Sequence, residues 1–173
     1  MKKFFAALAC AALFSVVSFA DVPLKGTWNM TQNVSGTTVS DNLTFDNDTE
    51  GLVVNTFVIN LKMSILGIKI TGGAEVSVSG KFVSDGDKLS IKWDRESYTD
   101  SKTPLSVTYK GEAMDDDEGY DEILDEIVAE IKKGLDESDE DEYYNVRVKG
   151  DKLYMTSDDE KGKASTDKFT KVK

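Results

Sequence analysis

Hydrophobic and polar residues alternate along most of this chain, and the alternation is clearest in Gly80–Asp94. Leu89, Ile91 and Trp93 are apolar, whereas the residues between them are polar. Because successive strand side chains point to opposite faces, this pattern predicts a β-strand with one buried and one solvent-facing side. Asp85-Gly86-Asp87 separates this run from the preceding one, and Asp-Gly between alternating runs indicates a tight hairpin.

Several other segments show the same alternation. They are Lys25–Thr31, Leu43–Phe45, Phe57–Ile65, Leu66–Ile70, Val76–Phe82, Leu105–Tyr109, Tyr144–Val148, Leu153–Met155 and the residues around Phe169. Between them, Gly67 predicts a turn or a bulge and Gly72-Gly73 predicts a break. An antiparallel sheet of eight or nine such strands closes on itself or splits into two layers. We therefore expect a mainly β fold, an antiparallel up-and-down β-barrel, with a β-sandwich as the alternative.

One amphipathic helix is predicted in an acidic insertion, residues 115–142, before the last strands. Its apolar positions recur at helical spacing and form one narrow stripe. They are Ile123, Leu124, Ile127, Val128 and Ile131. Acidic residues at the start and Lys132-Lys133 near the end complement the helix dipole, and Gly134 predicts the end of the helix. We expect Tyr120–Lys133 to be helical and Asp136–Glu142 to be a solvated acidic loop.

The apolar stripe of this helix needs a surface to cover it. Because the sequence predicts no second helix, we expect the stripe to pack on the barrel, either across one mouth or along the wall. We predict that the helix caps the barrel. Ile127 and Ile131 are expected to face the core, and Glu130 to face water.

The first 20 residues have the features of a secretory signal peptide. Lys2 and Lys3 precede the apolar segment Phe4–Phe14, and Ser18-Phe19-Ala20 provides small residues at a cleavage site. We expect cleavage after Ala20 and export, to the periplasm or out of the cell, with residues 21–173 forming a single domain. The apolar segment is too short for the alternative, a transmembrane helix, so no membrane insertion is expected after signal removal.

Cys10 is the only cysteine and lies inside this predicted signal. Cleavage before Cys10 would give a lipoprotein, but this alternative leaves the apolar residues 11–20 on the mature chain. Cleavage after Ala20 leaves no cysteine and hence no disulfide, so stability must come from packing.

The chain is strongly acidic, with a formal net charge of −11, and removal of Lys2 and Lys3 makes it −13. Such a surface repels nucleic-acid phosphates and anionic lipid head groups. We therefore expect no nucleic-acid partner. The partner classes that remain are a small hydrophobic ligand and a protein that contacts the acidic helix.

Catalytic chemistry is restricted by the residue types present. The chain has no histidine, and its cysteine lies in the predicted signal, which excludes Ser-His and Cys-His nucleophiles and the usual zinc ligand sets. We therefore expect neither an enzyme nor a cofactor. Asp46, Asp48 and Glu50, followed by Gly51, partly match a calcium-binding loop, but Phe57 stands where that loop needs its bidentate Glu. A hairpin loop accounts for this segment, so no metal site is expected.

Several motifs resemble the lipocalin-like domains of secreted bacterial proteins. Gly26-Thr27-Trp28 is similar to the G-x-W motif in the first strand of that barrel, whose Trp closes the floor. Thr44–Gly51 and Gly80–Asp94 resemble its hairpins, and Phe169-Thr170-Lys171 resembles its closing strand. The chain departs from the family in having no T-D-Y motif, no arginine in the last strand, and a helix placed before the final strands. The resemblance implies a closed barrel that carries a small hydrophobic ligand.

Large side chains at inward positions are the candidate ligand-binding residues. They are Trp28, Phe45, Phe57, Phe82, Trp93, Tyr109 and Tyr144. The interior of an eight-stranded barrel is just wide enough for its own side chains or for one small ligand. Two functions follow. The first is an exported barrel that binds a small hydrophobic ligand. The second is a non-enzymatic interaction module with a filled barrel, whose acidic helix region docks a protein or a cell-surface partner.

Overall fold

The computed structural model describes residues 22–34, 36–114, 117–137, 141–158 and 163–173. The predicted signal peptide with Cys10, and the acidic residues Asp115 and Asp116, lie outside the described residues. Among the residues that are described, no helix has both the length and the apolar character needed to span a membrane.

Strands dominate the described part of the chain, and each pairing between them is antiparallel. They are β1 (Gly26–Val34), β2 (Thr37–Phe45), β3 (Glu50–Ile65), β4 (Ile68–Asp85), β5 (Lys88–Tyr109), β6 (Glu112–Ala113), β7 (Asp141–Lys149), β8 (Lys152–Asp158) and β9 (Ala164–Lys171). Eight of them close into a ring in the order β1-β2-β3-β4-β5-β7-β8-β9, and β9 pairs with β1. The short β6 folds back on the end of β5. This closed antiparallel ring confirms the predicted barrel in preference to the sandwich.

The strands of the ring are joined unevenly. β3 and β4 pair along their whole shared length, from Glu50 with Val83 to Ile65 with Ile68. The seam between β1 and β9 has two residue pairs, Trp28 with Lys171 and Asn29 with Thr170. The seam is therefore the least extensively paired junction of the ring.

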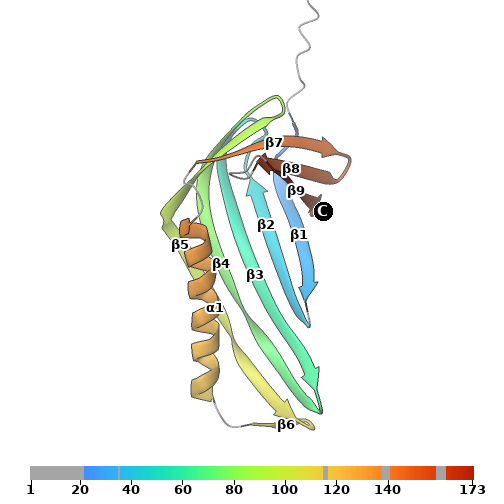
Figure 1. Cartoon of the computed structure of the whole chain (residues 1–173), viewed down its shortest axis with the longest axis vertical. Coiled ribbons are helices and arrows are strands. Elements are labelled where there is room, and N and C mark those ends of the chain that lie inside the picture. The colour runs from blue at the N-terminus through green and yellow to red at the C-terminus, as the bar shows by residue number, and fades with distance from the viewer. Residues whose placement is uncertain (1–21, 35, 115–116, 138–140, 159–162) are drawn as a thin grey trace, which may run out of the picture.

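β3, β4 and β5 are much longer than the other strands and extend beyond the ring (Figure 1). β5 is one strand, although the pattern of apolar residues predicts two, at Leu89–Trp93 and Leu105–Tyr109. The register between β4 and β5 shifts twice, once opposite Ser77–Ser79 and once opposite Thr71–Gly73. Each bulge reverses which side chains of β5 face inward, so the alternation is lost although the strand continues.

The sequence predicts a break at Gly72-Gly73 and a turn or bulge at Gly67, and only the second prediction is confirmed. Gly72-Gly73 lies inside β4 and does not break it, contrary to the prediction. Close packing requires glycine there, because a Cβ at Gly73 would lie 2.3 Å from the carbonyl oxygen of Ile59. Gly67 forms the expected turn, in which Leu66 and Gly67, at φ 51° and 88°, join β3 to β4.

The helix α1 spans Asp117–Glu137 and is longer at both ends than predicted. The prediction that Gly134 ends it is wrong, because the helix continues for another turn. A glycine inside a helix costs only about 1 kcal/mol, which tertiary contacts can offset. One such contact lies beyond the glycine, where the Tyr98 hydroxyl donates a hydrogen bond to Asp136 at 3.3 Å. The predicted loop 136–142 is therefore helical at its start, and its last two residues belong to β7.

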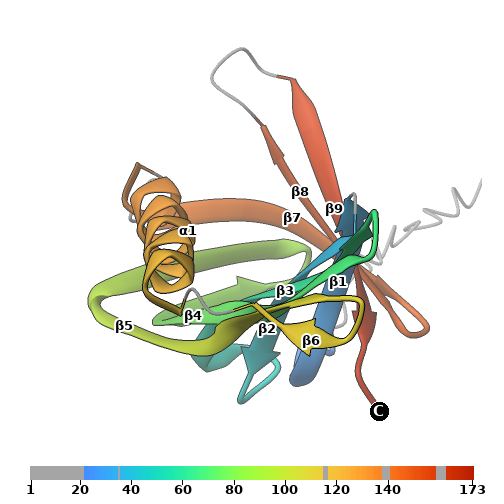
Figure 2. The ribbon, with the colours of Figure 1, turned by 90° about the horizontal axis from the view of Figure 1, so that it is seen from below.

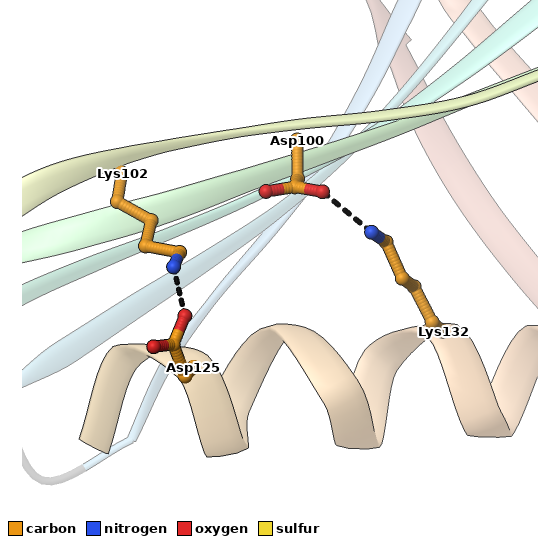
Figure 3. Close-up of polar contacts among 4 residues, drawn as sticks. All are labelled: Asp100, Lys102, Asp125 and Lys132. Carbon is orange, nitrogen blue, oxygen red and sulfur yellow. Dashed lines mark hydrogen bonds and ion pairs between the residues drawn. The ribbon is translucent and has the colours of Figure 1, made fainter. Parts of the chain in front are cut away.

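Two ion pairs join α1 to β5 (Figure 3). Lys102 of β5 pairs with Asp125 of α1, and Lys132 of α1 pairs with Asp100 of β5. The hydrogen bond from Lys132 lowers the pKa of the Asp100 carboxyl. Because the two pairs have opposite polarity, they favour one alignment of the helix along the strand.

The described residues form two hydrophobic cores. The first fills the ring and consists of Leu24, Trp28, Leu43, Phe45, Val53, Phe82, Leu89, Ile91, Val146, Leu153, Met155 and Phe169. The second lies under α1 and consists of Ala74, Val76, Leu105, Leu124 and Val128. Ala74, Val76 and Phe82 share one face of β4, so α1 covers the continuation of the inner face of the ring.

The helix runs along β4 and β5 instead of lying across the mouth of the ring, which corrects the expected cap. Figure 2 shows α1 beside β5 and far from β1. Its deepest residues are Leu124 and Val128, which are 0% and 6% exposed. The sequence predicts that Ile127 and Ile131 face the core. They pack against the second core but are only partly buried. Glu130 is exposed, as predicted.

Candidate functional site

A cavity of about 140 Å³ lies inside the ring, next to the first core. Its apolar wall consists of Leu43, Phe57, Ile91, Trp93, Met155 and Phe169. Its polar wall consists of Asp41, Asn55, Glu142, Tyr144 and Asp167. These side chains come from β2, β3, β5, β7, β8 and β9, so the closure of the ring is what brings them together.

Asp41 and Asn55 reach the cavity because they occupy inward positions of their strands. Asp41 is in phase with Leu43 on β2, and Asn55 is in phase with Phe57 on β3. The register places Asp41 opposite Phe57 and Asn55 opposite Leu43, so the two polar side chains lie on neighbouring strands. Asn55 is only 7% exposed.

Glu142 holds two aromatic side chains of the cavity wall in place. Its Oε2 atom accepts a hydrogen bond from Trp93 Nε1 at 2.7 Å and another from the Tyr144 hydroxyl at 2.7 Å. Burial, followed by the nearby Glu142 carboxylate, raises the pKa of Tyr144. Tyr144 is therefore a neutral hydrogen-bond donor that is already committed to Glu142.

Asp41 is the most perturbed carboxyl group of the cavity. Burial raises its pKa from 3.8 to about 7, a hydrogen bond from the Asn55 side chain opposes that rise, and Asp167 and Glu142 add to it. Near neutral pH, about half of the molecules therefore carry a protonated Asp41. The Oδ1 atoms of Asp41 and Asn55 are buried and have no hydrogen-bond partner. An unpaired buried oxygen is costly, so a hydrogen-bond donor that reached these two residues from the cavity would relieve that cost.

The structure divides the predicted cavity-wall residues into three groups. Phe57, Trp93 and Tyr144 line the cavity. Trp28, Phe45 and Phe82 are fully buried and fill the first core, where Phe45 and Phe82 pack edge to face with ring centroids 4.9 Å apart. Tyr109 lies at the far end of β5, beyond the ring, and is 44% exposed. It is not part of the cavity wall.

Trp28 has the surroundings of a residue that closes one end of the core. It is 0% exposed, and its Nε1 atom donates a hydrogen bond to the Leu24 carbonyl oxygen at 2.6 Å. The Lys171 ammonium lies 5.0 Å from the centroid of the Trp28 ring. A cation from β9 thus packs over the Trp28 ring.

Apart from Tyr144, the polar wall of the cavity is absent from the predicted set. Sequence reasoning selected large apolar residues and passed over Asp41, Asn55, Glu142 and Asp167. A usable signal was present for the first two, since each is a polar residue at the inward phase of an otherwise apolar run. Such a residue is either paired inside the core or faces a cavity. Glu142 gave no comparable signal, because it follows an acidic run that reads as a solvated loop.

The candidate calcium loop is a connection between β2 and β3 that uses its acids locally. Asp46 Oδ1 accepts the Leu52 amide at 2.8 Å, and Asp48 Oδ1 accepts the Lys25 amide at 2.7 Å. Glu50 begins β3 and is exposed. Within the described ranges, no three acidic side chains gather closely enough to hold a metal ion.

A second concave region lies between α1 and β3. It is an open groove of about 490 Å³ lined by Ile59 of β3 and by Ile123, Glu126, Ile127, Glu130 and Ile131 of α1. Ile59 is two residues from Phe57 on the same face of β3, so the groove and the cavity border neighbouring inward positions of this strand. Ile123 is 45% exposed there.

The fold and the cavity geometry are the available basis for a functional assignment. Comparisons with protein-family models, with curated proteins and with solved structures gave no match to this chain.

Proposed function

We propose that this protein is an exported, non-enzymatic barrel that binds one small molecule in the cavity bounded by Asp41, Asn55 and Trp93. The observation that carries the proposal is the pair of unpaired, buried oxygen atoms on Asp41 and Asn55, two residues that line a cavity with aromatic walls. Binding pockets in proteins combine an apolar lining with a few converging polar groups, and this cavity has both.

The main competing explanation is that the cavity holds only water. Buried waters often satisfy polar groups that lack a protein partner. The volume of about 140 Å³ is well above the need of one water, and an engineered cavity of about 150 Å³ accepts benzene. A ligand of roughly that size would bury an apolar body against Phe57 and Trp93 and satisfy the oxygen atoms at its polar end.

Binding is favoured over catalysis by the chemistry of the cavity wall. Among the residues described as lining it, the ionisable groups are three carboxyls and one tyrosine, with no lysine or arginine. The wall therefore lacks a cationic group that could stabilise negative charge as it develops in a reaction. The lipocalin-like resemblance and the predicted signal peptide support export and carriage.

The test is native mass spectrometry of protein purified from the compartment to which it is exported. We expect a bound small molecule on the wild-type chain and its loss in Asn55→Leu, which puts an apolar side chain into the polar wall. Asn60→Leu is the matched control, because Asn60 is exposed on the outer phase of the same strand. Failure to find any bound molecule, together with no binding from a library of small fragments, would refute the proposal.

A second function is favoured by the groove between α1 and β3. Exposed Ile123 lies there beside Glu126 and Glu130, which suits a protein partner with an apolar side chain flanked by basic residues. Deletion of the helix is not a usable test, because Leu124 and Val128 belong to the second core. Ile123→Ser should instead abolish docking of such a partner and leave binding in the cavity unchanged. Equal docking by the wild type and the variant would exclude this function for the groove.

A further inference from the structure

We propose that the cavity selects a ligand with a protonated amine on a compact apolar body, and that the amine binds between Asp41 and Asn55. The inference rests on the proposed function and specifies its ligand class. It depends on which polar groups in the cavity are already paired and which are not.

When Asp41 is ionised, the unpaired polar atoms of the cavity wall accept hydrogen bonds and do not donate them. The Tyr144 hydroxyl and Trp93 Nε1, which could donate to a ligand, both donate to Glu142. The unpaired atoms are Oδ1 of Asp41 and Oδ1 of Asn55. A ligand that satisfies both must bring donors, and an ammonium group brings three.

The charge of the cavity wall favours a cation over a neutral donor. Asp41, Glu142 and Asp167 all line the cavity, and the described lining contains no basic side chain. Asp167 and Glu142 disfavour the charged form of Asp41, so a cation bound at Asp41 would relieve this repulsion. The same arrangement repels carboxylate and phosphate ligands. Trp93 and Phe57 add aromatic rings against which an organic cation can pack.

The ionisation of Asp41 links binding to pH. The groups that face Asp41 are Asn55 of β3, Glu142 and Tyr144 of β7, and Asp167 of β9. An ammonium ligand binds the ionised form of Asp41 and must displace its proton at low pH. Affinity should therefore rise about tenfold for each pH unit up to about pH 7 and level off above it.

Three probes of one shape separate the ligand classes. Benzylamine, benzyl alcohol and benzoate share a ring that matches the cavity in size and differ in charge at the attached group. Isothermal titration of the purified chain at pH 8 should give binding in the order benzylamine, then benzyl alcohol, with none for benzoate. Asp41→Asn should weaken benzylamine binding about 10- to 100-fold and leave benzyl alcohol nearly unchanged. Asp87→Asn, in the exposed turn between β4 and β5, is the control.

The outcomes distinguish the ligand class from the proposed function. Equal affinity for benzylamine and benzyl alcohol, or tighter binding of benzoate, would overturn the proposed amine ligand class. The proposal that the cavity binds a small molecule would still stand. Absence of binding by all three probes, with no molecule bound to the native protein, would overturn both. A flat pH profile for benzylamine between pH 5 and 8 would show that Asp41 is not the anchor, even if the amine binds.

Discussion

The raised pKa of Asp41 predicts that this residue destabilises the fold as pH rises. The perturbation is Asp41→Asn, which keeps the size of the side chain and its ability to hydrogen-bond with Asn55 but removes the ionisable proton. In the folded protein Asp41 is largely removed from water and lies near Glu142 and Asp167, whereas in the unfolded chain it is surrounded by water. The cost of ionisation therefore falls on the folded state alone.

The magnitude follows from the two pKa values. Burial and the neighbouring carboxylates raise the pKa of Asp41 to about 7 in the folded protein, from an ordinary value of 3.8. Between these values the folded state binds more protons than the unfolded state, so the free energy of unfolding falls as pH increases, by about 1.4 kcal/mol per pH unit. The full loss is on the order of 4 kcal/mol and is complete above pH 7. Solvent at the mouth of the cavity makes this an upper value.

Urea denaturation of both chains between pH 4.5 and 8.5 measures the effect. The difference in unfolding free energy between Asp41→Asn and the wild type removes the contribution of the other acidic residues. Because about 1 kcal/mol of this loss already occurs below pH 4.5, we expect the difference to shift in favour of the variant by about 2 to 3 kcal/mol between pH 4.5 and pH 8. Asp87→Asn, which changes an exposed acid in the turn between β4 and β5, is the control. If the difference in unfolding free energy stays constant across this pH range, the claim that the folded state disfavours the ionised form of Asp41 is refuted.

Three further predictions concern the helix and the long strands, and each is checked by the urea midpoint at pH 7. Leu124→Ala, in the second core, should lower the free energy of unfolding by about 2 to 5 kcal/mol. Glu130→Ala, on the exposed face of α1, should change it by less than about 0.5 kcal/mol. Similar effects of the two substitutions would show that α1 is not docked. Gly134→Ala should raise the free energy of unfolding by about 1 kcal/mol, because a Cβ there meets nothing within 4 Å. Gly73→Ala should lower it, because a Cβ there would meet the Ile59 carbonyl oxygen. A change of the same sign for both variants would contradict the described packing. Lys132→Met removes one of the two ion pairs and should cost no more than about 1 kcal/mol, with the cost vanishing in 1 M salt if the pair is the cause.

The closed ring could be predicted because strand periodicity is a local property of the sequence. The runs at Gly80–Asp94 and Phe57–Ile65 already show which side chains face inward and where turns occur. Closure of a sheet of such strands removes its exposed edges. The length of β5 could not be predicted, because a bulge shifts the phase of the side chains and then looks like the end of a strand. Gly134 misled for a related reason, since tertiary contacts on both sides of it override its local preference.

The cavity was only partly predictable because its composition depends on register. Phe57, Trp93 and Tyr144 were found by size and phase, but the same criteria also selected Trp28, which fills the core. Whether a large inward residue fills the ring or borders a void depends on the residues opposite it, and these come from strands far away in the chain. Asn55 is the instructive case, since a buried amide in an apolar run marks a cavity more specifically than another aromatic residue does.

The short seam between β1 and β9 has a consequence for the order of folding. The hairpins from β1 to β5 form from neighbouring segments, whereas the seam joins opposite ends of the described chain and carries the largest loop-closure entropy. With two residue pairs to offset that entropy, we expect the seam to form last. Until then β1 and β9 are unpaired edges that a second chain could extend. Lys168 and Lys171 place positive charge along β9, a common protection of exposed edges. While the ring is open, the charge of Lys171 thus disfavours pairing of β9 with a second chain. Once the ring has closed, Lys171 packs against Trp28.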